Sequence, residues 1–144
     1  MFIGGGPRPL TAILLCKKYG LTCTVLEKDL ESYVMSVALL QALGLSDGVQ
    51  VLHIDAEDYT KYSAFSLIYL AAMVGQDEAS KNKIISLIHH KIKKGKSLLC
   101  RSSHGTRKLL YVPVAKDLFK EIRPVLEVRP YNSIINSFFI LQKT

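Results

Sequence analysis

The chain has 144 residues, of which 49% are hydrophobic, and a formal net charge of +7. This length and apolar content fit one compact domain and exclude a disordered chain. The sequence has no run of about 18 apolar residues that would span a membrane and no secretion signal at its start, so we expect a cytoplasmic protein.

The first residues are typical of a nucleotide-binding unit. A strand-like pair, Phe2–Ile3, precedes a glycine loop, Gly4–Gly6, and Pro9–Tyr19 has the apolar spacing of a helix that ends at Gly20. Glycines let a ligand approach the backbone, and a helix N-terminus offers free N–H groups. Since a strand normally runs for about five or six residues, we expect part of this strand to precede Met1.

The middle of the chain alternates between strand-like and helix-like segments, as in a doubly wound α/β fold. The apolar run Phe65–Val74 suits a central parallel strand buried on both faces. The other predicted strands are Leu21–Glu27, Val49–Ile54 and Ser97–Arg101, and the predicted helices are Tyr33–Leu43 and Glu78–Lys94.

The last third of the chain predicts an addition at the sheet edge. Val125–Val128 and Ser137–Leu141 are expected to pair like a hairpin. The fold class is therefore α/β and Rossmann-like, with a mostly parallel sheet and an antiparallel edge strand, as in class I S-adenosylmethionine-dependent methyltransferases. No repeat or linker interrupts the sequence, so residues 1–144 are predicted to form a single domain.

Positive charge is concentrated in residues 79–116, which contain ten lysines and arginines and no acidic residue. This stretch is either a solvated helix face or an anion-binding surface. Binding of single-stranded nucleic acid favours aromatic residues between the basic ones, and Tyr111 alone meets that condition. We therefore expect no nucleic-acid partner.

The cysteines Cys16, Cys23 and Cys100 contain no Cys-x-x-Cys pair. Their spacing predicts buried thiols in a reducing compartment, with neither a disulfide nor a metal site.

Two acidic residues lie where a nucleoside would need them. Glu27 ends the second predicted strand, where a carboxylate can accept both ribose hydroxyls. Asp55 follows the third strand and can accept from an adenine amine, with Ala56 leaving space beside the base. The glycine loop precedes Glu27 by about 20 residues, as in dinucleotide sites. This spacing leaves both NAD and S-adenosylmethionine open, and either carboxylate alone is compatible with a solvated strand end.

Five segments in this order resemble archaeal-type nicotianamine synthases, and the resemblance selects S-adenosylmethionine. The segments are Phe2–Thr11, Leu70–Gly75, Arg101–Arg107, Leu110–Val114 and Asn136–Ser137. The resemblance covers nearly the whole chain, but only the C-terminal, cofactor-binding half of a family member.

The resemblance implies transfer of a 3-amino-3-carboxypropyl group to an amine, with release of methylthioadenosine. Orientation decides which carbon of the sulfonium reacts, and a base must deprotonate the amine. In the family, the glutamate and tyrosine that serve this step precede the glycine loop. We therefore expect a helical N-terminal domain to be missing here, and cofactor binding rather than turnover by this chain.

The predicted site residues fall into three groups. The cofactor-binding group is Gly4, Gly5, Gly6, Pro7, Glu27, Lys28, Asp55, Ala56, Ala71 and Ala72. The substrate-binding group is Arg101, His104 and Arg107. The guanidinium groups of the two arginines can hold carboxylates or form structural salt bridges. His104 and Tyr111 are the candidates for a catalytic group. The alternative for His104 is a turn residue bonded to the local backbone, and the alternative for Tyr111 is a packing residue. His53, in a strand, is predicted to be packed.

Two other functions stay open. One is an ordinary class I methyltransferase, which would release S-adenosylhomocysteine. The other is a non-catalytic binding or assembly module. The methyltransferase would use a small or macromolecular substrate, and its basic stretch could recruit RNA. The partners expected for the favoured reading are a small-molecule amine or amino-acid acceptor and a second copy or partner chain that covers the open pocket, because large apolar patches mark interfaces.

Overall fold

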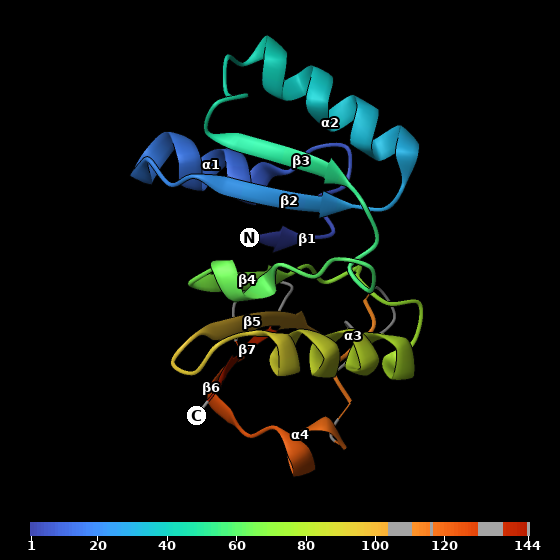
Figure 1. Cartoon of the computed structure of the whole chain (residues 1–144). Coiled ribbons are helices and arrows are strands. Elements are labelled where there is room, and N and C mark those ends of the chain that lie inside the picture. Colours follow the sequence, from blue (N-terminus) through green and yellow to red (C-terminus); the bar gives the residue numbers. More distant parts are fainter. Residues whose placement is uncertain (104–110, 116, 130–136, 144) are drawn as a thin grey trace. The chain divides into compact units, whose positions relative to one another are not determined.

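The computed structural model of the chain describes residues 1–103, 111–115, 117–129 and 137–143. The chain divides into two compact units, Met1–Tyr59 and Thr60–Thr144, which Figure 1 colours from blue to red along the sequence. Among the described residues, every helix is too short or too polar to cross a membrane. The single domain expected for residues 1–144 stays a prediction.

The first unit consists of three parallel strands and two helices (Figure 1). Both helices pack against β2 and β3. The strands lie in the order β3-β2-β1, with Phe2 opposite Val25 and Thr24 opposite Gln50. The elements are β1 (Phe2–Ile3), α1 (Leu10–Tyr19), β2 (Cys23–Glu27), α2 (Leu30–Ala42) and β3 (Val49–His53).

The ends of the two helices follow from local chemistry. Gly20 adopts a left-handed conformation with φ 65° and ends α1 as predicted, its N–H donating to the carbonyl of Cys16. Helix α2 begins three residues before the predicted Tyr33, because the side chain of Asp29 accepts from the backbone N–H of Ser32 and caps it.

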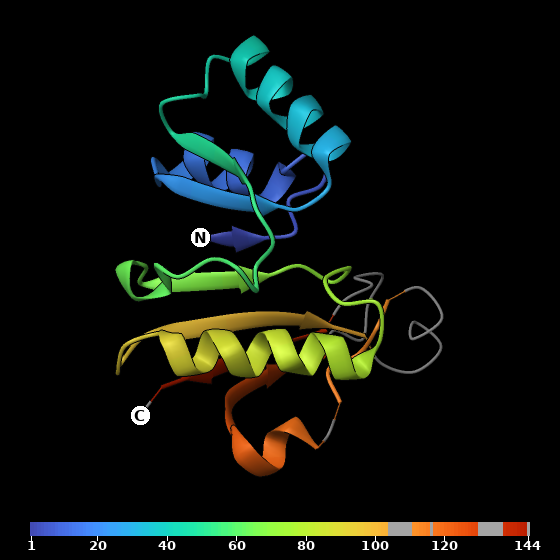
Figure 2. The same cartoon turned by 45° about the vertical axis from the view of Figure 1, so that its right-hand side comes forward.

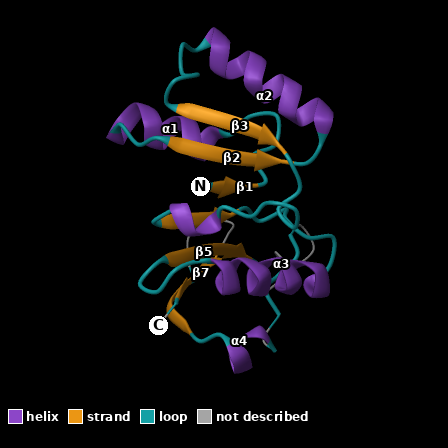
Figure 3. Ribbon diagram, viewed as in Figure 1, coloured by secondary structure: helices purple, strands orange, loops and turns teal. Residues whose placement is uncertain are grey.

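The second unit combines parallel and antiparallel strands (Figure 3). Strand β4 pairs with β5 in parallel, and β7 pairs with both β5 and β6 in antiparallel orientation. This confirms the mostly parallel α/β fold with an antiparallel edge. The elements are η1 (Tyr62–Ala64), β4 (Leu67–Leu70), α3 (Glu78–Lys91), β5 (Ser97–Ser102), α4 (Leu118–Glu121), β6 (Pro124–Val128) and β7 (Ser137–Gln142).

The predicted strand Phe65–Val74 is shorter than expected. Only Leu67–Leu70 is a strand, and its burial alternates, since Leu67 is 45% exposed whereas Ile68 is fully buried. The backbone then turns, with the N–H of Val74 bonded to the carbonyl of Ala71. An apolar run predicts burial but does not show where a strand gives way to a turn.

Helix α3 lies along β5 (Figure 2). It begins with a capping box between Asp77 and Ser80, and its isoleucines form the predicted apolar face. The buried side chains of this face are Ile84, Ile85, Ile88 and, just after the helix, Ile92. They form the core of this unit together with Ile68, Leu70, Leu98 and Leu141.

Candidate functional site

The glycine loop is fastened to the end of β2 through the carboxylate of Glu27. Its Oε2 accepts from the backbone N–H of Gly6 at 2.6 Å, and its Oε1 accepts from the N–H of Asp29 at 3.0 Å. The N–H of Gly4 donates to the carbonyl of Leu26 at 3.0 Å. Glu27 is only 7% exposed, so its charge is stabilised by backbone donors. Each carboxylate oxygen still has a lone pair for a further donor.

Each glycine of the loop is required for a specific reason. Gly4 and Gly6 have positive φ values of 79° and 61°, which side chains rarely adopt. A Cβ at Gly5 would overlap Cγ1 of Val25 on β2. Pro7 follows as an exposed residue. The loop therefore keeps its backbone close to β2 and free of side chains.

The start of α1 has no side-chain cap. Its N-cap residue is Pro9, and the first turn contains no acidic residue. Helix N-termini carry partial positive charge and unsatisfied N–H groups. The N–H of Leu10, the first residue of α1, donates to the carbonyl of Arg8 at 2.7 Å, so the role predicted for this helix end stays a prediction.

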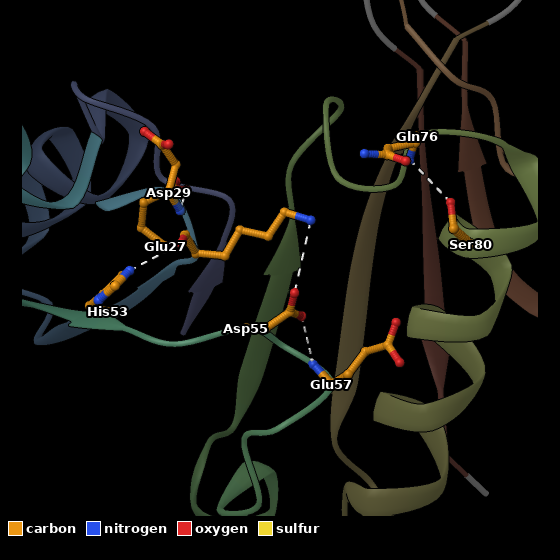
Figure 4. Close-up of polar contacts among 8 residues, drawn as sticks. Glu27, Asp29, His53, Asp55, Glu57, Gln76 and Ser80 are labelled. Atoms are coloured by element: carbon orange, nitrogen blue, oxygen red, sulfur yellow. Dashed lines mark hydrogen bonds and ion pairs between the residues drawn. The ribbon is translucent and has the colours of Figure 1, made fainter. Parts of the chain in front are cut away.

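A second group of polar residues follows β3 (Figure 4). Oδ1 of Asp55 accepts from the N–H of Glu57 at 3.0 Å, and its Oδ2 lies 3.9 Å from Nζ of Lys28 in an ion pair open to solvent. Such an exposed pair is worth little stability, so Asp55 can exchange Lys28 for another donor. Ala56 is buried.

His53 is exposed, which contradicts the packing predicted for it. The reason is that His53 is the last residue of β3, whereas Val49 and Val51, which precede it on the same face, are buried. Its ring stacks on Tyr33 with centroids 5.3 Å apart, and its Nε2 lies 3.1 Å from the carbonyl of Lys28. His53 thus covers the backbone that follows Glu27.

Ala71 and Ala72 belong to the second unit and form the turn after β4. The carbonyl of Ala71 accepts from the N–H of Val74. Ala72 is 4% exposed, and its carbonyl accepts from Nζ of Lys81 at 2.7 Å.

The other predicted residues lie at or beyond the end of β5. Arg101 is half-buried on β5, opposite Phe138 of β7. Tyr111 is half-buried, and its carbonyl accepts from the hydroxyl of Ser103 at 2.5 Å. His104 and Arg107 lie outside the described residues.

The structure contradicts the prediction for Lys81. This residue belongs to the basic stretch 79–116, for which a solvated face or an anion-binding surface is predicted, but its side chain is fully buried. A signal was present, because Lys81 precedes Ile84, Ile85 and Ile88 at helical spacing and so lies on their face. The pKa of Lys81 is lowered from 10.5 to about 8, chiefly by burial; Cys100 opposes this shift and Arg101 adds to it.

The thiols and acidic residues of the described part of the chain form no metal centre. Among the described residues, no three His, Cys, Asp or Glu side chains are grouped to hold an ion. The cysteines are free, Cys23 and Cys100 being buried and Cys16 half-buried.

The fold is that of the Rossmann-like class I S-adenosylmethionine-dependent methyltransferases. The crystal structure of an RNA methyltransferase from Salinibacter ruber in complex with S-adenosyl-L-homocysteine matches 99% of this chain and 78% of its own, with a TM-score of 0.73 and 11% identity. A likeness at this identity concerns the fold alone.

More similar structures define the family. Two crystal structures of MtNAS, one in complex with MTA and tNA and one of a glutamate-to-glutamine mutant in complex with S-adenosylmethionine, are 30% identical to this chain. They match 99% of it and 52% and 53% of their own chains, with TM-scores of 0.85 and 0.84. Nicotianamine synthase from Solanum lycopersicum is 30% identical over 146 residues, which cover 99% of this chain and 46% of that protein.

The family model for nicotianamine synthase protein matches residues 1–144, and the chain belongs to this family. It spans about half the length of the curated relatives that it matches.

Proposed function

We propose that this chain binds S-adenosylmethionine, with the glycine loop Gly4–Gly6 and Glu27 at the centre of the site. The observation that carries the proposal is the bond between the Gly6 N–H and Glu27, in a family whose member MtNAS was crystallised with this compound. The bond holds a loop without side chains next to a carboxylate that has spare acceptor capacity.

The residues around this centre have distinct proposed roles. Glu27 accepts from the ribose hydroxyls, and the uncapped start of α1 attracts the carboxylate of the ligand. Asp55 accepts from the adenine amine after releasing Lys28, and Ala56 leaves room for the base. The roles expected for Pro7, Ala71 and Ala72 stay predictions from the family resemblance.

We further propose that the complete protein transfers a 3-amino-3-carboxypropyl group to a small-molecule amine or amino acid. The amine nitrogen forms a bond to the carbon attached to sulfur, the carbon–sulfur bond breaks, and its electron pair stays with sulfur in the departing methylthioadenosine. The amine gives its proton to a base. Arg101 and Arg107 are the proposed holders of the acceptor's carboxylate, and His104 and Tyr111 are the candidate proton acceptors of this chain.

The proposed setting is the cytoplasm, and the proposed assembly is a homodimer or a complex with a partner chain. Leu10 and Leu14 on α1 support an interface, because they lie one turn apart and are 60% and 62% exposed. Size-exclusion chromatography with light scattering tests the homodimer, and a monomer at all concentrations would contradict it.

The transfer reaction is tested by incubating the purified chain with S-adenosylmethionine and amine acceptors and identifying products by mass spectrometry. Methylthioadenosine together with an amine that has gained the aminocarboxypropyl group supports the proposal. S-adenosylhomocysteine would instead identify a methyltransferase, to which the fold likeness alone points. Binding without either product would show that this chain binds the cofactor without turnover, which is the behaviour expected of it alone and also that of a non-catalytic module.

A further inference from the structure

Lys81 connects two segments that follow neighbouring strands of the second unit. Its Nζ donates to the carbonyl of Ala72, in the turn after β4, at 2.7 Å, and to the carbonyl of Val112, beyond the end of β5, at 2.8 Å. The side chain is fully buried. The ammonium group thus links the Ala72 turn to the segment Tyr111–Ala115 from within the protein.

The Ala72 turn is also held against the backbone of Lys81. A Cβ at Gly75 would lie 2.7 to 2.9 Å from Cβ, Cα and N of Lys81, and Gly75 has a φ of +87°. Gln76 and Asp77 donate their N–H groups to the hydroxyl of Ser80 at 3.1 Å. The turn and the first residues of α3 therefore form one hydrogen-bonded unit, with Lys81 at its inner side.

The segment Tyr111–Ala115 is fixed by side chains from two elements. From α3, Oδ1 of Asn82 accepts from the N–H of Ala115 at 3.2 Å. From the end of β5, the hydroxyl of Ser102 accepts from the N–H of Val114 at 2.9 Å, and that of Ser103 donates to Tyr111. Lys81 donates both to this segment, at Val112, and to the Ala72 turn.

A buried lysine lowers the stability of the fold unless its N–H groups satisfy buried acceptors. Burying an ammonium group is unfavourable, and the groups of the described residues that act on its charge, Arg101 and Cys100 on β5, are not carboxylates. A methionine of similar size would fill the space but leave the carbonyls of Ala72 and Val112 without this donor. The hydrogen bonds, rather than the volume or the charge, therefore account for Lys81.

We propose that Lys81 is a positioning residue for S-adenosylmethionine binding, which holds the Ala71–Ala72 turn in its binding conformation and ties it to the segment Tyr111–Ala115. The inference rests on the proposed function, because Ala71 and Ala72 are taken to belong to the cofactor-binding group. Lys81 itself touches no ligand, since it is fully buried.

The test compares Lys81→Met with Lys81→Gln. Both variants remove the charge, but only glutamine keeps donors. Calorimetric titration with S-adenosylmethionine is expected to give a dissociation constant that is at least about fivefold higher for Lys81→Met than for Lys81→Gln. Equal constants in two folded variants would overturn the proposal. Lys94→Met, at an exposed lysine beyond the same helix, is the control and should bind like the wild type.

A further measurement applies if Lys81→Met does not fold. The ¹⁵Nζ resonance of Lys81 in the wild type is then recorded while S-adenosylmethionine is added, and an unchanged resonance at saturation would overturn the positioning role.

If the wild type does not bind S-adenosylmethionine, the proposed function fails. The network is then tested separately by hydrogen exchange at Val74, Val114 and Ala115, which should be faster in Lys81→Met than in Lys94→Met.

Discussion

The backbone N–H of Gly6 donates to Oε2 of Glu27 at 2.6 Å, across 21 positions of sequence. The other carboxylate oxygen accepts from Asp29, so one buried side chain fixes both the glycine loop and the turn into α2. The residue proposed to bind ribose is thus also the residue that shapes the loop.

Glu27→Ala is expected to weaken S-adenosylmethionine binding at least about tenfold and to lower the free energy of unfolding by about 2 kcal/mol, because two backbone donors lose a charged acceptor. Titration calorimetry and urea unfolding measure the two effects. Glu31→Ala, at an exposed position on α2, is the matched control. A Glu27→Ala protein with unchanged affinity would remove Glu27 from the site.

Gly5→Ala is expected to lower the free energy of unfolding by about 1 to 3 kcal/mol, because the new methyl group would overlap Val25. Val25→Ala makes space for this methyl group. The double variant should therefore be more stable than the sum of the two single effects predicts. Urea unfolding of all four proteins measures this coupling, and strictly additive effects would show that Gly5 is not confined by Val25.

The stability of the protein is expected to depend on the titration of Lys81, whose pKa burial lowers to about 8. Between about pH 8 and 10.5 the unfolded chain keeps a proton that the folded chain has released, so the free energy of unfolding rises with pH in this interval. The upper limit of this rise is about 1.4 kcal/mol per pH unit.

Urea unfolding at several pH values checks this prediction as the difference between the wild type and Lys81→Met. Both proteins should carry Cys100→Ala, so that the titration of the adjacent thiol does not contribute. A difference that stays constant from pH 7 to 10.5 would mean that Lys81 keeps an ordinary pKa in the folded state.

The three thiols are expected to differ in reactivity. Burial raises the pKa of Cys100 to about 12, and it also raises that of Cys23, whereas Cys16 is half-buried. Because the thiolate is the reactive form, a maleimide should modify Cys16 first in the native protein and all three alike in denaturant. Mass spectrometry of peptides reports the order, and early modification of Cys100 would show that it is accessible.

Local signals in the sequence predicted much of the fold. The glycine loop, the end of α1 at Gly20 and the pairing of β6 with β7 depend on residues close to one another in the chain, and all are present. The predicted start of α2 at Tyr33 is too late, because the side chain of Asp29 accepts from the N–H of Ser32 and caps the helix there.

Features that depend on distant neighbours were less predictable. His53 is exposed because it is the last residue of β3. The buried ammonium group of Lys81 has its acceptors in the carbonyls of Ala72 and Val112, which are distant in the sequence. Glu27 was predicted as a ligand residue from its spacing to the loop, but its bond to Gly6 requires the two segments to meet. Charge and spacing identify candidates, whereas their hydrogen-bond partners depend on the tertiary structure.

Calorimetric titration of the purified chain with S-adenosylmethionine tests the central claim most directly, with methylthioadenosine, S-adenosylhomocysteine and NAD titrated in parallel. We expect saturable binding of the adenosyl compounds, no binding of NAD, and loss of affinity in Glu27→Ala. Absence of binding by a folded wild-type chain, or equal binding of NAD, would contradict that claim.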